Sequence, residues 1–127
     1  MRTAAQPASA FPLVFEALKQ ILKPYEKNLK IMEDTPVRYT LGGTIQMGKK
    51  TKESMLMAVY SMKNYVSIHL MPLYMGPESA DEISAELKKR RQGKACFNFA
   101  EVDPKLFKET EKVVKKSITA CKAKKLI

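Results

Sequence analysis

The sequence has no tryptophan, two cysteines and a single histidine among its 127 residues. Neither Cys96 nor Cys121 has a second cysteine or a histidine at the short spacing that zinc and dithiol redox motifs require. A single histidine, His69, also makes neither a catalytic triad nor a metal site by itself. We therefore predict no metal and no cofactor, and the cysteine usage favours a reduced, cytoplasmic protein.

Long apolar runs are also missing. No stretch approaches the roughly 18 uninterrupted apolar residues that indicate a membrane span. The first ten residues contain one arginine but no apolar region after it, so the sequence predicts no signal peptide and no membrane partner. A chain of this length can bury one core, and we predict a frayed tail over residues 1–10 followed by a single domain over residues 11–127.

Acidic residues are scarce relative to basic ones. Lysine and arginine number 23 and aspartate and glutamate 13, which gives a net charge of +10 and favours anionic partners. The densest basic run holds the anion-binding candidates Lys88, Lys89, Arg90, Arg91 and Lys94. Phosphate contacts from such a run would give weak, sequence-independent nucleic-acid binding with a steep salt dependence. Alternatively, Arg90 and Arg91 complement the dipole at a helix end.

The spacing of apolar residues predicts an α+β domain in the order α-β-β-β-α-β-α, with a mainly antiparallel sheet packed against helices. Pro12 is expected to open the first helix, and Pro24 to break it after Lys23. Glu33 and Asp34 are expected in a loop. Strands are predicted at residues 37–41, 55–62, 65–71 and 95–99, the first of them ended by Gly42 and Gly43.

Capping signals predict two further helices. Ser79 with Glu82 fits a capping box, and Gly93 can supply a left-handed terminator, so a helix is expected between them. Asp103 and Pro104 are expected to begin the final helix. Its apolar side would consist of Leu106, Val113, Val114, Ile118 and Cys121, and its basic side of Lys105, Lys108, Lys112, Lys115, Lys116 and Lys122.

The predicted strand at residues 65–71 alternates apolar Val66, Ile68 and Leu70 with a mixed set of side chains. A site is expected on the mixed face, where His69 would be a neutral, hydrogen-bonded pocket residue rather than a base. The candidate ligand-pocket residues are Tyr60, His69, Met71 and Tyr74, with Lys94 as an anion anchor.

Two catalytic interpretations find little support in the sequence. A Cys-His nucleophile pair requires Cys96 and His69 on neighbouring strands facing the same side, which the sequence leaves open. The apolar neighbours of Cys96 favour packing in the core instead. Gly43, Gly48 and Lys49 match the first part of a phosphate-binding loop, but Lys50 stands where that motif requires serine or threonine. We therefore predict no catalytic residues.

Three segments carry a family resemblance: NYVS at residues 64–67, HLMPLY at 69–74 and ELKKRRQGKACFNF at 86–99. Together they resemble the YdhG-like family of bacterial domains of unknown function, over nearly the whole domain. The resemblance implies a small α+β fold. Some members of that family are described as frataxin-like iron chaperones, and the acids available here for such a role are Glu16, Glu26, Glu33 and Asp34, dispersed among lysines.

The leading hypothesis is a non-enzymatic module that binds a small anionic ligand or a protein partner through the mixed sheet face and the basic run. An iron-chaperone role is the first alternative, and weak nucleic-acid association the second. An enzyme that uses His69 is the third alternative.

Overall fold

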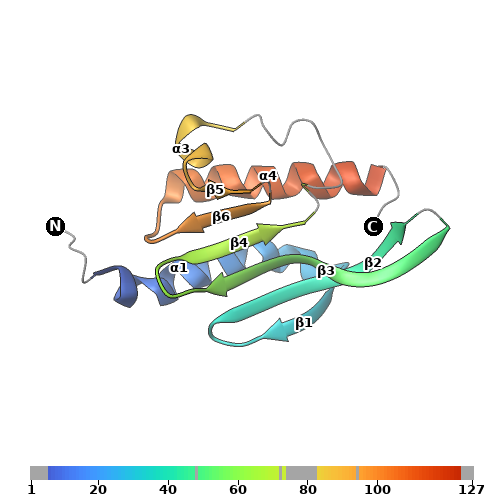
Figure 1. Ribbon diagram of the computed structural model, residues 1–127, viewed down its shortest axis with the longest axis horizontal. Helices are drawn as coiled ribbons and strands as arrows, with labels where there is room; N and C mark the ends of the chain where they lie inside the picture. The colour runs from blue at the N-terminus through green and yellow to red at the C-terminus, as the bar shows by residue number, and fades with distance from the viewer. Residues whose placement is uncertain (1–5, 48, 72, 74–82, 94, 124–127) are drawn as a thin grey trace.

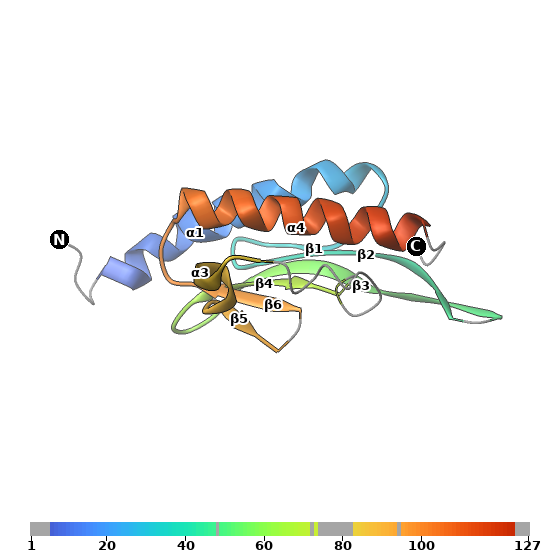
Figure 2. The ribbon, with the colours of Figure 1, turned by 90° about the horizontal axis from the view of Figure 1, so that it is seen from above.

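Two long helices cover one face of an antiparallel sheet in the computed structural model, which describes residues 6–47, 49–71, 73, 83–93 and 95–123 (Figures 1 and 2). The described helical segments are α1 (Gln6–Leu22), the 3₁₀ helix η1 (Lys23–Lys27), α3 (Ala85–Lys88) and α4 (Pro104–Ala123). The strands are β1 (Lys30–Asp34), β2 (Arg38–Met47), β3 (Lys50–Ser61), β4 (Val66–Leu70), β5 (Arg91–Gln92) and β6 (Cys96–Phe99).

The strand order in the sheet is β1-β2-β3-β4-β6-β5, and every neighbouring pair is antiparallel. Strands β1 to β4 follow one another as a meander. The β5–β6 hairpin then adds β6 beside β4 and leaves β5 at the edge. The predicted α+β class is confirmed, although β1 and β5 are strands that the sequence analysis did not expect.

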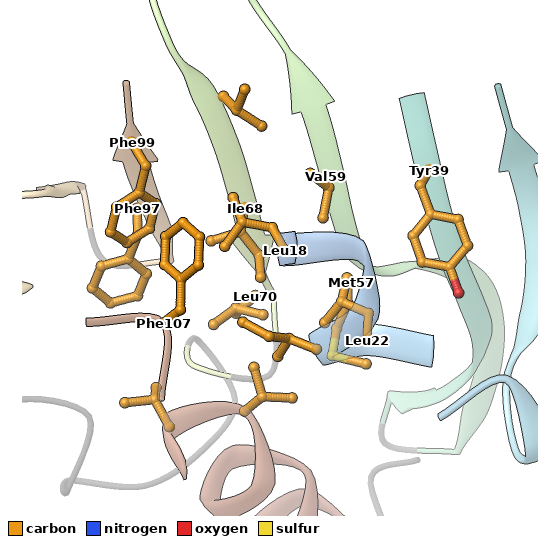
Figure 3. Packing of buried hydrophobic residues seen from close by; sticks show 14 of the residues in the cluster. Leu18, Leu22, Tyr39, Met57, Val59, Ile68, Leu70, Phe97, Phe99 and Phe107 are labelled. Atoms are coloured by element: carbon orange, nitrogen blue, oxygen red, sulfur yellow. The ribbon is translucent and has the colours of Figure 1, made fainter. Parts of the chain in front are cut away.

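The core lies between the sheet and the two long helices (Figure 3). Leu18 and Leu22 of α1 are fully buried, as are Ile68 and Phe97 of the sheet. From α4, the ring of Phe107 meets Phe99 edge-on at a centroid distance of 4.8 Å, which is a favourable aromatic arrangement. We call this side of the sheet the covered face and the opposite side the open face.

The predicted division into an apolar and a polar side is confirmed for β4 and for α4, as far as their side chains are described. Val66, Ile68 and Leu70 of β4 are buried on the covered face. The predicted apolar residues of α4 are buried and its predicted lysines are exposed, whereas the side chain of Cys121 lies outside the description. Asp103 caps α4 as expected, since its Oδ1 accepts a hydrogen bond of 3.1 Å from the Leu106 N–H.

The first helix ends where the sequence predicts but begins earlier. Helix α1 stops at Leu22, and the chain continues as η1 with Pro24 near its start. However, α1 begins at Gln6, so the predicted tail over residues 1–10 was too long, and Pro12 lies inside the helix instead of opening it. Alanine tolerates helix well, which explains why Ala8 and Ala10 extend it. Residues 1–5 lie outside the description.

Strands β1 and β2 also differ from the sequence prediction. Strand β1 contains Glu33 and Asp34, which the sequence analysis placed in a loop. It is an edge strand with nearly all of its side chains exposed, and it therefore lacks the alternation that signals a half-buried strand. Strand β2 runs on through Gly42 and Gly43 because the pairing with β3 shifts register at Gly42, and glycine accommodates such an irregularity.

The middle helix is much shorter than predicted. Ser79 and Glu82 lie outside the described residues, and the described helix α3 is a single turn capped by Ser84, whose Oγ accepts from the Leu87 N–H at 3.1 Å. Arg90 directly follows the C-cap Lys89, whereas Arg91 belongs to β5 and does not lie at the helix end as predicted. Gly93 does have the left-handed φ of 68°, but it turns the β5–β6 hairpin instead of ending a helix.

None of the helices in the described ranges has the length and apolar character needed to cross a membrane.

Candidate functional site

The open face carries the mixed set of side chains that the sequence predicted for β4. Residues opposite each other in antiparallel strands point to the same side of a sheet, and their neighbours along each strand point to the other. The register pairs Tyr60 with Ser67, Ser67 with Asn98, and His69 with Cys96. Since Ile68 and Phe97 face the helices, these five side chains share the open face.

Cys96 and His69 form a close pair on this face. The Cys96 Sγ lies 2.9 Å from the His69 Nδ1, within hydrogen-bonding distance, and Cys96 is half-buried. The prediction that Cys96 packs in the core was wrong. Its neighbours Ala95 and Phe97 are buried because strand alternation sends them to the covered face, and the same alternation sends Cys96 to the open face.

The surroundings of this pair favour its uncharged form. Burial lowers the pKa of His69, and the nearby positive charge of Arg38 lowers it further. The Tyr60 ring lies 5.0 Å from the imidazole and also faces the Arg38 guanidinium, whose central carbon is 4.1 Å from the Tyr60 centroid. Burial raises the pKa of the Cys96 thiol. At neutral pH the two residues therefore rest as a thiol and a neutral imidazole.

Polar contacts continue from His69 towards β1. The Tyr60 hydroxyl lies 3.2 Å from the Thr40 Oγ1, which donates to the Glu33 Oε1 at 3.3 Å. Arg38 Nε donates to the same Glu33 oxygen at 3.0 Å, so the positive charge that acts on His69 is itself paired with a carboxylate. The contacts thus link side chains of five strands across the open face, from β1 to β6.

An open cavity of about 330 Å³ lies next to the Cys96–His69 pair. We call it the open-face cavity, and it is lined by Met62, Tyr65, Ser67, His69, Gln92, Gly93 and Cys96. These residues offer hydroxyl, amide, imidazole and thiol groups but no carboxylate, lysine or arginine. Behind the lining, Asn98 donates to the Gln92 Oε1 at 2.8 Å, while the Asn98 Oδ1 is buried without a hydrogen-bond partner in the described structure.

Only some of the predicted pocket residues lie at the open-face cavity. His69 lines the open-face cavity, whereas Tyr60 is not one of the lining residues and contacts the His69 ring instead. Met71 does not line the cavity, because the cavity extends from His69 towards the beginning of β4 and Met71 follows its end. Tyr74 and Lys94 lie outside the described residues. Alternation from His69 could have identified Ser67 and Tyr65, whereas Gln92 and Gly93 depend on the unexpected strand β5.

The basic run spans the end of α3, the turn after it and strand β5. Lys88, Lys89 and Arg90 are exposed. Arg91 is half-buried and pairs with Phe97, and this register places it on the covered-face side of β5, away from the open-face cavity. Of the anion-binding candidates, Arg91 therefore lies on the side of the sheet opposite to the cavity, and Lys94 lies outside the described residues.

The acids considered for iron do not gather into a site. Glu16 accepts from Gln20, and Asp34 pairs with Lys19 at 2.8 Å. Glu26 accepts from the buried Tyr39 hydroxyl, and Glu33 binds Arg38. Across the described ranges, no group of three or more His, Cys, Asp or Glu side chains could hold a metal ion.

Comparison of the chain with protein-family models, with curated proteins and with solved structures finds no match. The YdhG-like resemblance therefore stays a prediction from the three sequence segments.

The single histidine allows a direct test of the site's electrostatics. We expect NMR titration to give His69 a pKa below its ordinary value of 6.5, and Arg38→Met to raise it part of the way, because burial remains. Lys112→Met, on the exposed side of α4, should leave the pKa unchanged. Because the unfolded chain binds this proton more readily, the free energy of unfolding should fall as pH drops through about 6.5. A normal or raised pKa would contradict the described surroundings of His69.

Proposed function

We propose that this protein is a non-enzymatic, cytoplasmic binding module that holds a small anionic ligand in the open-face cavity. The observation that carries the proposal is a cavity of about 330 Å³, lined by mixed polar and apolar side chains, on the sheet face that the long helices leave uncovered. Cavities of roughly 300–1,000 Å³ with a few convergent polar groups are typical of small-molecule sites.

The charge distribution supports an anionic ligand. The described lining residues include no carboxylate, so none of them repels an anion. Exposed cationic residues adjoin the lining in the chain, with Lys63 directly after Met62 and Arg90 shortly before Gln92. The net charge of +10 adds a long-range field that draws anions to the surface. In this proposal, hydrogen bonds from Ser67, Tyr65 and Gln92 orient the ligand, and the basic surroundings select its charge.

The electrostatics of the pair support binding rather than catalysis. A Cys-His nucleophile works from a stabilised thiolate, whereas burial raises the pKa of Cys96 and lowers that of His69. Tyr60 and Cys96 contact the imidazole and the positive charge of Arg38 acts on it, and none of these three residues is a carboxylate that would stabilise an imidazolium. A half-buried free thiol also suits a reducing compartment.

The alternatives drawn from the sequence gain less support. An iron chaperone of the YdhG-like family would need carboxylates that converge, but Glu16, Glu26, Glu33 and Asp34 each engage a separate partner. Nucleic-acid association would use exposed lysines, which lie both on α4 and around α3. Neither role accounts for the open-face cavity.

A thermal-shift panel of citrate, nucleotides, short DNA and ferrous iron at fixed ionic strength tests the proposal. We expect at least one small anion to raise the melting temperature of the wild type. Gln92→Trp, at an exposed position in the lining, should fill the cavity and weaken that binding at least tenfold. The matched variant Gln20→Trp, at an exposed position of helix α1, should bind normally.

Three other outcomes would contradict the proposal. Binding that is unaffected by Gln92→Trp would place the ligand elsewhere. A response to DNA alone, steeply salt-dependent and lost on Lys88→Glu with Lys89→Glu, would indicate nucleic-acid association. No shift with any ligand would favour a protein-interaction role.

A further inference from the structure

The open-face cavity has a reactive group at one end. Cys96 Sγ and His69 Nδ1 lie together there, and Gln92 is the register partner of Cys96. Tyr65 precedes His69 by four residues, which is about 13 Å at the rise of a β-strand. The Met62 N–H donates to the Tyr65 carbonyl at 2.8 Å, so both residues lie at the far end. A small extended molecule in the cavity would therefore have one end at the sulfur.

The sulfur is arranged for proton transfer. A distance of 2.9 Å between Cys96 Sγ and His69 Nδ1 lets the imidazole take the thiol proton without any movement of the backbone. The imidazole is uncharged at neutral pH and so is free to accept that proton. The thiol is uncharged as well, so its reaction would depend on His69 and not on a standing thiolate.

We propose that Cys96 is an acceptor site for small anionic disulfides, with which it forms a mixed disulfide by thiol–disulfide exchange assisted by His69. This inference rests on the proposed function, because the same cavity first holds the disulfide. His69 Nδ1 accepts the thiol proton as Cys96 Sγ attacks one sulfur of the bound disulfide. A new S–S bond forms and the old one breaks. The leaving thiolate takes the proton back from His69, so the exchange needs no further oxidant.

Other uses of the pair fit the described residues less well. A metal ion would find two protein ligands in Cys96 and His69, whereas stable protein sites use three or four. A stoichiometric exchange needs one thiol, one base and a cavity that seats the disulfide. Each of these is present on the open face.

The test follows adduct formation by mass spectrometry after the reduced protein is mixed with glutathione disulfide, which is anionic. Hydroxyethyl disulfide and cystamine serve as neutral and cationic probes of the same reaction. We expect one adduct per chain at Cys96, formed faster than any adduct at Cys121, and fastest with glutathione disulfide. His69→Asn, which keeps a polar side chain but not the base, should slow the adduct at least tenfold.

Controls separate chemistry from folding. The melting temperature of His69→Asn establishes that it folds, and Gln92→Trp offers a second variant at an exposed position. It should slow exchange with all three disulfides, whereas Gln20→Trp should not. The proposal is overturned if Cys96 reacts no faster in the folded chain than in urea, or if His69→Asn leaves its rate unchanged.

The outcomes also distinguish this inference from the proposed function. Exchange rates that depend on His69 but are equal for anionic, neutral and cationic disulfides would show that the cavity does not select anions. The Cys96–His69 pair would then still accept disulfides, but without regard to their charge. That result would overturn the anion selectivity in the inference. Tight binding of an anion, lost in Gln92→Trp, without any adduct at Cys96 would overturn the inference and leave the binding module intact.

Discussion

Leu18→Ala is expected to lower the free energy of unfolding by about 2–5 kcal/mol. Leu18 is fully buried in α1 and belongs to the hydrophobic cluster between the helices and the sheet (Figure 3). Truncation to alanine removes apolar contacts and leaves a cavity that the rigid sheet cannot close. The change is measured by urea unfolding followed by circular dichroism.

Leu13→Ala is the matched control on the same helix. Leu13 is 67% exposed, so its truncation should alter the free energy of unfolding by no more than about 0.5 kcal/mol. Similar losses in the two variants would contradict the assignment of one side of α1 to the covered face of the sheet. That assignment matters for function, because it defines which face stays open.

Gly42→Ala is expected to destabilise the protein by about 1–3 kcal/mol, as overpacking does in a close-packed region. A Cβ at this position would lie 2.7 Å from the backbone oxygen of Ser54 and would overlap the Sδ of Met32. The methionine can move, but the Ser54 carbonyl belongs to the paired strand β3 and cannot shift without disturbing the sheet. Thermal and urea unfolding both measure the effect.

Gly43→Ala provides the comparison one residue further on. Its Cβ would meet side-chain methyl groups of Leu29 and Leu56 at 3.4 Å, close to ordinary van der Waals contact. We expect a change below about 1 kcal/mol in either direction, since alanine also reduces the freedom of the unfolded chain. A larger loss for Gly43→Ala than for Gly42→Ala would contradict the described close approach of the Ser54 carbonyl to Gly42.

The fold was predictable wherever the chain alternates between two clear environments. Strand β4 and helix α4 each place apolar side chains on one side only, because both lie between the core and an exposed surface. Strand β1 could not be found this way. As an edge strand with exposed Ile31 and Met32, it has no side that differs from the other in burial.

The site was predictable in part, for the same reason. Alternation along β4 placed His69 on a mixed face, and the structure confirms that face. Cys96 was assigned to the core from its apolar neighbours, although adjacent residues in a strand face opposite sides, so Phe97 in the core implies Cys96 outside it. Gln92 lines the cavity because α3 ends at Lys88 and strand β5 follows. No capping signal within the described chain indicated this early end of the helix.

The central claim is that the open-face cavity, and not the basic side of α4, binds a small anion. Amide NMR spectra recorded during titration with each anion of the thermal-shift panel test it most directly. We expect at least one anion to shift the amide signals of Tyr65, Ser67, Gln92 and Gly93 together, and Gln92→Trp to abolish these shifts. Shifts confined to the exposed lysines of α4, or no response to any anion, would contradict it.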